Sequence, residues 1–206
     1  MTSGAAPVPW VAARARVGAQ TIVQIACVTR ERLSASFAEE VVCDATRYTL
    51  ADLPRARVSE REAQGMVEAL VRRAGPDAAV RLLHEAGVRT AGYLLERRIP
   101  HPMQALIRLL PRRIAFLLLM DMVRRNAWTF AGSAHVGILR RRDGADMVVA
   151  HCSMCRGMHE HIPMCTFYRG TLERLISELA APFAFVEEVE CMAQNAAVCR
   201  FEIRNS

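Results

Sequence analysis

The fold is decided by residues 163–203, which have the sequence PMCTFYRGTLERLISELAAPFAFVEEVECMAQNAAVCRFEI. From Pro163 to Ala181, leucine and isoleucine recur at helical spacing, which predicts an amphipathic helix opened by the proline. The segments 183–192 and 198–204 predict two strands of a hairpin, with its turn centred on Asn195. A helix followed by a hairpin indicates one part of an α+β domain.

Upstream of this stretch, the sequence predicts helices first and strands afterwards. A capping box, Ser59 with Glu62, starts one helix, and Gly75-Pro76 ends it. The predicted helices are 17–32, 34–43, 59–75, 77–100, one beginning at Pro102, and 112–125. The predicted strands are 128–136, 137–142 and 146–151. We therefore expect a helical N-terminal half followed by an antiparallel sheet with a packed helix, arranged as a helical extension (1–58) and a ligand-binding domain (59–206).

Composition limits the class of protein. The chain has 206 residues, 52% of them hydrophobic, which is enough for a sizeable core without disulfides. The net charge of +6 comes from arginines that are dispersed in pairs, a pattern more typical of solvated helix ends than of a nucleic-acid surface. No apolar run approaches the length of a signal peptide or a membrane helix, so we expect a cytoplasmic protein without a transmembrane segment and without a nucleic-acid partner.

Three of the seven cysteines have a spacing that metal ligands can have. Cys191 and Cys199 are symmetric about Asn195, so a hairpin turning there places them opposite each other, with Cβ atoms about 4.5–5.5 Å apart. A helix packed over the hairpin can bring Cys165 to the same point. Thiolates at this separation suit a tetrahedral zinc ion, but buried cysteine is also an ordinary core residue, and the spacing alone leaves both interpretations open.

A family resemblance favours the metal. Residues 163–203 resemble the vinyl-reductase-type domain, whose pattern they carry as a cysteine before Phe167-Tyr168-x-Gly170, followed by Glu188-x2-Cys191-x7-Cys199-x-Phe201-x-Ile203. In phenol-sensing regulators with this domain, one cysteine, one glutamate and two further cysteines bind zinc. The resemblance therefore implies a structural Zn²⁺ bound by Cys165, Glu188, Cys191 and Cys199.

Two points about the ligands remain open in the sequence. Strict alternation along a strand places Glu187, and not Glu188, on the same face as Cys191, so Glu188 can be a ligand only if the strand bulges. A second group, Cys152-x2-Cys155 with His151, His159 and His161, has a legitimate metal or redox spacing. We find no second pair to complete four ligands there, so we expect no second metal.

The resemblance extends over nearly the whole chain to the BchJ-type family of bacteriochlorophyll-synthesis proteins, through Trp128-Thr129-Phe130-x-Gly132-Ser133 and 151–157. More distant relatives of the fold include trafficking-complex subunits and haem-binding sensors, which implies a hollow between helices and sheet. The implied ligand is a Mg-porphyrin or chlorophyllide intermediate. Candidates for lining its site are Tyr93, Phe116, Trp128, Phe130, His135 and Tyr168, with His84, His101 or His135 as an axial ligand to magnesium.

The family name implies a vinyl reductase, but the sequence contains no phosphate-binding glycine loop for a nicotinamide or flavin. We name no catalytic residue and favour a carrier or accessory factor that works with the enzymes of bacteriochlorophyll synthesis. The alternatives are a reductase with an external electron donor and a small-molecule sensor. A homodimer is left open.

Overall fold

Most helices begin and end at the signals that the sequence provides. The computed structural model describes residues 15–205. Its helices are α2 (Gln20–Arg32), α3 (Ala35–Ala45), α4 (Glu60–Ala74), α5 (Pro76–Arg97), α6 (His101–Leu109), α7 (Arg112–Arg125) and α8 (Thr166–Leu179), with short 3-10 turns η1 (Ala127–Thr129) and η2 (Met192–Gln194). Its strands are β1 (Arg16–Val17), β2 (Val58–Ser59), β3 (His135–Arg140), β4 (Gly144–Ala150), β5 (Phe185–Glu190) and β6 (Cys199–Arg204).

The start of α4 confirms the predicted capping box. The Ser59 side chain accepts a backbone hydrogen bond while the Glu62 carboxylate accepts the Ser59 amide. The start of α5 differs from the prediction, because Gly75, not Asp77, is the N-cap residue, and Pro76 occupies the first helical position. Gly75 has a φ of 79°, an angle that glycine adopts at no steric cost, so the chain turns sharply between the two helices.

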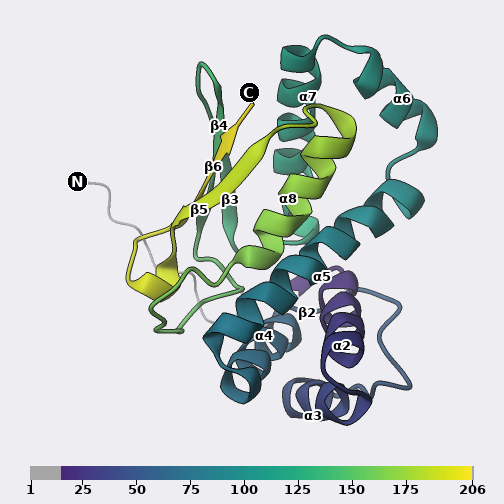
Figure 1. Cartoon of the computed structure of the whole chain (residues 1–206), viewed down its shortest axis with the longest axis vertical. Helices are drawn as coiled ribbons and strands as arrows, with labels where there is room; N and C mark the ends of the chain where they lie inside the picture. Colours follow the sequence, from purple (N-terminus) through teal and green to yellow (C-terminus); the bar gives the residue numbers. More distant parts are fainter. Residues whose placement is uncertain (1–14, 206) are drawn as a thin grey trace.

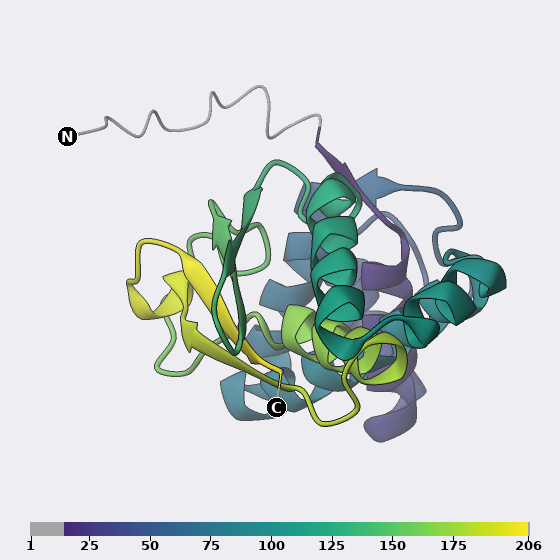
Figure 2. The same cartoon turned by 90° about the horizontal axis from the view of Figure 1, so that it is seen from above.

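The four longer strands form one antiparallel sheet in the order β3-β4-β6-β5. In Figure 1 the sheet stands beside α7 and α8, and Figure 2 shows the same arrangement from above. The inward face carries Met147 and Phe201, which are paired across β4 and β6 and are at most 1% exposed. The fold is therefore the expected α+β type, with helices covering one face of an antiparallel sheet.

One predicted strand is wrong. The segment 128–136 forms the 3-10 turn η1 and a further turn at Gly132, and β3 begins only at His135. The backbone amide and the hydroxyl of Ser133 both donate to the carboxylate of Glu60. This buried carboxylate takes the hydrogen bonds that a neighbouring strand would otherwise supply, so the alternating apolar pattern does not produce a strand.

The helices and the sheet share one hydrophobic core among the described residues. Ile22 and Ile25 of α2 belong to the same buried cluster as Phe201 of β6. The strands β1 and β2 pair Arg16 with Ser59 across the predicted boundary between extension and domain, a boundary that stays a prediction. Residues 1–14 of the predicted extension lie outside the described residues. Within 15–205, no helix combines the length and the hydrophobicity needed to cross a membrane.

Candidate metal centre

A cluster of five cysteines and one glutamate lies between the end of the sheet and the start of α8. All five cysteines are completely buried, and Glu188 is 7% exposed. Two groups of four residues each bring their potential ligand atoms within 4.8 Å of one another: Cys165, Glu188, Cys191 and Cys199, and Cys152, Cys155, Cys165 and Cys199. Both groups can hold a metal ion.

Each ligand is placed by a different element. Cys199 opens β6 opposite Val149 of β4, so its side chain points to the covered face of the sheet. Cys191 directly follows β5, and Asn195, with a left-handed φ of 66°, closes the turn between them. Cys165 directly precedes α8. The hairpin and the helix thus converge on one point, as the spacing of the three cysteines predicts.

The backbone around Cys165 explains why α8 begins at Thr166 and not at Pro163. The amide of Cys165 donates to Oε2 of Glu188 at 2.9 Å, and the amide of Met164 donates to Sγ of Cys191 at 3.4 Å. These two amides serve the cluster, so the chain stays non-helical through Cys165. The neighbouring amide of Met192 likewise donates to Sγ of Cys199 at 3.4 Å.

The structure decides between the two glutamates in favour of Glu188. The pairing of β5 with β6 shifts between Glu188 and Glu190, which is the irregularity that a Glu188 ligand requires. Before this bulge Val186 and Glu188 face inward while Glu187 is exposed, and after it Cys191 faces inward. Strict alternation therefore gives the wrong face, because one extra residue at Val189 reverses the side-chain order.

Burial and mutual contact set the protonation of the cluster. Burial raises the pKa of Glu188 to about 10, and the nearby Cys191 adds to this effect. Hydrogen bonds from neighbouring thiols lower the pKa of Cys191 and of Cys199 to about 6, whereas those same contacts hold the pKa of Cys165 well above its ordinary value. The cluster thus concentrates negative charge on two sulfurs beside a carboxyl that is protonated at neutral pH.

The residues fit a thiophilic cation. Oε1 of Glu188 is buried and has no hydrogen-bond partner, which is costly unless a cation or another donor occupies that position. Soft thiolate ligands favour zinc and similar ions over magnesium or calcium. A cation here would also favour the charged form of the carboxyl and of the remaining thiols.

The pair Cys152 and Cys155 belongs to this cluster, which the sequence analysis did not foresee. The expectation that no second pair completes four ligands is wrong, since Cys165 and Cys199 supply that pair. Sequence spacing could not show this, because 44 positions separate Cys155 from Cys199, whose sulfurs lie 3.4 Å apart. No histidine belongs to either group in the described part of the chain, and His151 instead lies with its ring near that of His135.

The residues proposed to line a pigment site are only partly brought together. Phe130 and Tyr168 form an edge-to-face pair with ring centroids 5.7 Å apart, and the Tyr168 hydroxyl donates to the Phe130 carbonyl. Trp128 is 57% exposed, with the guanidinium of Arg57 over its ring. Tyr93 is half-buried on α5. These aromatic side chains therefore do not surround one common hollow.

The proposed axial histidines also lie apart from one another. His84 of α5 is bonded to Glu173 of α8 at 2.6 Å, which ties up one ring nitrogen. His101 and His135 are exposed, at the start of α6 and of β3.

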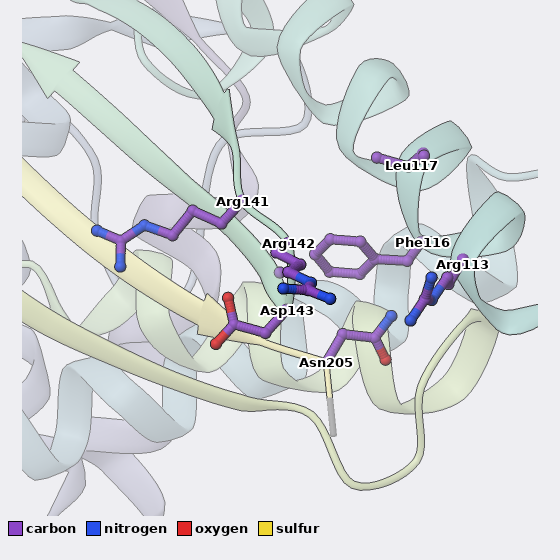
Figure 3. A pocket seen from close by; sticks show the side chains of 8 residues that line it. Arg113, Phe116, Leu117, Arg141, Arg142, Asp143 and Asn205 are labelled. Atoms are coloured by element: carbon purple, nitrogen blue, oxygen red, sulfur yellow. The ribbon is translucent and has the colours of Figure 1, made fainter.

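Phe116 lines a surface hollow of about 370 Å³ between α7 and the turn that joins β3 to β4. Figure 3 shows Arg113 and Arg142 beside the Phe116 ring, with Asp143 and Asn205 on the strand side, while Arg141 points away. Arg141 is paired with Asp146 at 2.5 Å, but Arg113 and Arg142 have no ion pair with any described residue. The hollow thus offers an aromatic face between two uncompensated cations.

The hollow and the cysteine cluster lie at opposite ends of the sheet. Gly144, which lines the hollow, pairs with Arg204, whereas Val149 pairs with Cys199. Five residues of strand separate them, or roughly 17 Å.

Comparison with known proteins identifies relatives of both the sheet and the whole chain. Residues 146–205 match the vinyl-4-reductase domain family. The chain is 37% identical over 128 residues to the bacteriochlorophyll synthase 23 kDa chain of Cereibacter sphaeroides, a match that spans 62% of each chain and so less than two thirds of that relative. It is 29% identical over 204 residues to the protein of the same name from Rhodobacter capsulatus, covering 97% of this chain and 91% of the relative.

Solved structures with the same fold are H-NOX proteins. The Fe(II) unliganded H-NOX protein of K. algicida superposes with a TM-score of 0.60 at 10% identity, covering 92% of this chain and 97% of that one. An H-NOX protein of S. oneidensis gives a TM-score of 0.55 at 12% identity, covering 92% and 99%. At such low identity the likeness shows the fold alone. It agrees with the expected relationship to haem-sensor folds.

Proposed function

Since residues 146–205 carry a vinyl-4-reductase domain and the chain resembles bacteriochlorophyll synthase 23 kDa chains over 97% of its length, we propose that this protein serves bacteriochlorophyll biosynthesis. It binds a Mg-porphyrin or chlorophyllide intermediate and presents it to the enzymes of the pathway. The single observation that carries the binding role is the arginine-flanked hollow at Phe116.

The chemistry of the hollow suits such a pigment. The Phe116 ring and the Leu117 side chain offer an apolar surface against which one edge of a flat macrocycle can pack. Arg113 and Arg142 are placed to pair with propionate carboxylates, and a guanidinium binds a carboxylate through two parallel hydrogen bonds. The open shape of the hollow fits a carrier, because a partner enzyme can then reach the part of the pigment that remains outside.

The test is a spectroscopic titration of the purified protein with Mg-protoporphyrin monomethyl ester and with divinyl protochlorophyllide, without reductant. We expect saturable binding with a shifted Soret band. The double variant Arg113→Ala/Arg142→Ala should weaken binding on the order of 10-fold or more, as expected for the loss of charge-assisted hydrogen bonds. Arg55→Ala, an exposed arginine outside the hollow, is the matched control and should bind like the wild type. Binding unaffected by the double variant would contradict the proposed site, and no binding to either pigment would contradict the function.

We further propose that Cys165, Glu188, Cys191 and Cys199 hold a structural Zn²⁺. The closeness of their ligand atoms and the unpartnered oxygen of Glu188 support this assignment. The ion would tie the start of α8 to the β5–β6 hairpin, so its binding energy would add to folding stability. Four protein ligands around zinc leave no open coordination position, which agrees with a structural rather than a catalytic ion.

A further inference from the structure

Two residues of the cysteine cluster belong to both of its four-ligand groups. Cys165 and Cys199 occur with Glu188 and Cys191 in one group and with Cys152 and Cys155 in the other. The two groups therefore comprise six residues, in which two positions are shared and four are not.

We propose that these six residues form a binuclear centre that binds two thiophilic divalent ions of the zinc class, with Cys165 and Cys199 bridging them. One ion is bound by the two bridging thiolates, Glu188 and Cys191, and the other by the two bridging thiolates, Cys152 and Cys155. The proposal rests on the structural zinc site proposed above and adds to it a second ion with four sulfur ligands.

The distances between sulfurs fit this arrangement. Tetrahedral zinc with Zn–S bonds of about 2.3 Å places its sulfurs roughly 3.8 Å apart. The Sγ atoms of Cys152 and Cys165 are 3.4 Å apart, those of Cys155 and Cys199 are 3.4 Å apart, and the two bridging sulfurs are 3.6 Å apart. Each sulfur of the Cys152–Cys155 pair thus lies against one bridging sulfur, as two terminal ligands of the same ion should.

Charge balance favours a second ion. With one divalent ion in the group of Glu188, three thiolates and one carboxylate leave two net negative charges, and Cys152 and Cys155 must stay protonated against metal-bound sulfurs. With two divalent ions, five thiolates and one carboxylate also leave two net negative charges. The second ion therefore allows both buried cysteines to be ligands without adding charge to a dry interior.

The loop that carries Cys152 and Cys155 is held in place from the helical half. The guanidinium of Arg156 donates to the carbonyl of His151 at 2.7 Å and lies 3.2 Å from the carboxylate of Glu60, which is 2% exposed. Gln64 of α4 donates to the carbonyl of Arg156 at 3.0 Å. These bonds fix both ends of the Cys152–Cys155 turn, so the two thiols are presented to the cluster by a built support.

An iron–sulfur cluster fits less well. Such a cluster places several irons and sulfides between its thiolate ligands, so the ligands must stand further apart than around one ion. Here all four sulfurs of the second group lie within 4.8 Å of one another. That space accommodates a single ion.

The test is the zinc content of the purified full-length protein by elemental analysis and native mass spectrometry. We expect two zinc ions per chain in the wild type and one in Cys152→Ser and in Cys155→Ser. Cys43→Ser, at an exposed cysteine outside the cluster, is the matched control and should keep two. One zinc in the wild type, unchanged by Cys152→Ser, would overturn the binuclear centre while leaving the single zinc site intact. No zinc, or iron in its place, would overturn both.

A measurement on the wild type alone tests the bridges, in case variants fail to fold. Protein loaded with ¹¹³Cd should show two NMR signals that are coupled to each other through the shared sulfurs. The ion with four sulfur ligands should give the more deshielded signal. Two uncoupled signals, or one signal, would contradict bridging by Cys165 and Cys199.

Discussion

At the scale of single residues, Glu188 shows how a metal ligand can be concealed in a strand. Its carboxyl is buried, accepts the Cys165 amide through one oxygen and leaves the other without a partner. Burial raises its pKa to about 10, so the metal-free protein carries this group as a neutral acid. A glutamine has nearly the same shape and is also neutral, which separates the effect on folding from the effect on metal binding.

We therefore expect Glu188→Gln to leave the melting temperature of the metal-stripped protein close to that of the wild type. In contrast, its zinc affinity should fall on the order of 10–100-fold, because an amide oxygen replaces a charged ligand. Competition with a chromogenic chelator measures the affinity. Glu187→Gln, at the adjacent exposed position, should change neither quantity. Equal zinc affinity in both variants would remove Glu188 from the ligand set.

At the scale of elements, the crossing of α5 and α8 supports the cluster, since α8 follows directly from Cys165. The two backbones touch there: a Cβ at Gly87 would overlap the carbonyl of Phe167, and one at Gly170 would overlap the carbonyl of His84. Both glycines are thus required by close approach. The two glycines within α5, which weakened the prediction of one continuous helix, do not interrupt it.

Gly87→Ala should destabilise the protein by about 1–3 kcal/mol or more, because the helices must separate to admit the methyl group. Gly92→Ala, in the same helix, meets nothing within 4 Å and should stabilise it by up to about 1 kcal/mol through helix propensity. Urea denaturation of the two variants measures both changes. The same sign for both would contradict the close crossing.

The same crossing contains a group that responds to pH. Burial raises the pKa of Glu173, but hydrogen bonds from His84 and Arg169 outweigh burial and hold the pKa below its ordinary value. A lowered carboxyl pKa contributes stability that is present above the ordinary pKa of about 4.3 and is lost as pH falls through the folded value. We expect Glu173→Gln to reduce the loss of stability in acid, measured as the melting temperature from pH 7 to pH 3. Glu178→Gln, near the end of the same helix, is the control.

At the scale of the whole molecule, the segment that matches the vinyl-4-reductase family is not separated from the helices before it. The core cluster runs without a break from Ile22 in α2 to Phe201 in β6. Glu60, at the start of α4, accepts hydrogen bonds from Ser133 and lies beside Arg156, so the helical half also supports the loop of Cys152 and Cys155. The metal cluster and the pigment hollow lie at opposite ends of one sheet, which lets the first act as a fixed support for the second.

A fragment of residues 59–206 should therefore be much less stable than the full chain. Removal of α2 would expose side chains of α5 that its residues Ile22, Ile25 and Val28 now cover, all at most 1% exposed in the full chain. Each large apolar side chain returned to water costs about 1.5–3 kcal/mol. Thermal melting of the fragment and the full chain, both zinc-loaded, measures the difference. Equal melting temperatures would establish 59–206 as an independent domain.

The sequence by itself determined what local physics controls. The capping box at Ser59, the stop at Gly75-Pro76 and the hairpin around Asn195 follow from residue type and spacing, and all appear in the structure. Only tertiary structure decided the rest. The bulge at Val189 turns Glu188 inward, and Glu60 captures Ser133 and so replaces a predicted strand with a turn. Cys152 and Cys155 join Cys165 and Cys199 because a loop and two strands, distant in sequence, fold onto one buried point. Contacts of this kind depend on how elements pack, and no local pattern of residues records them.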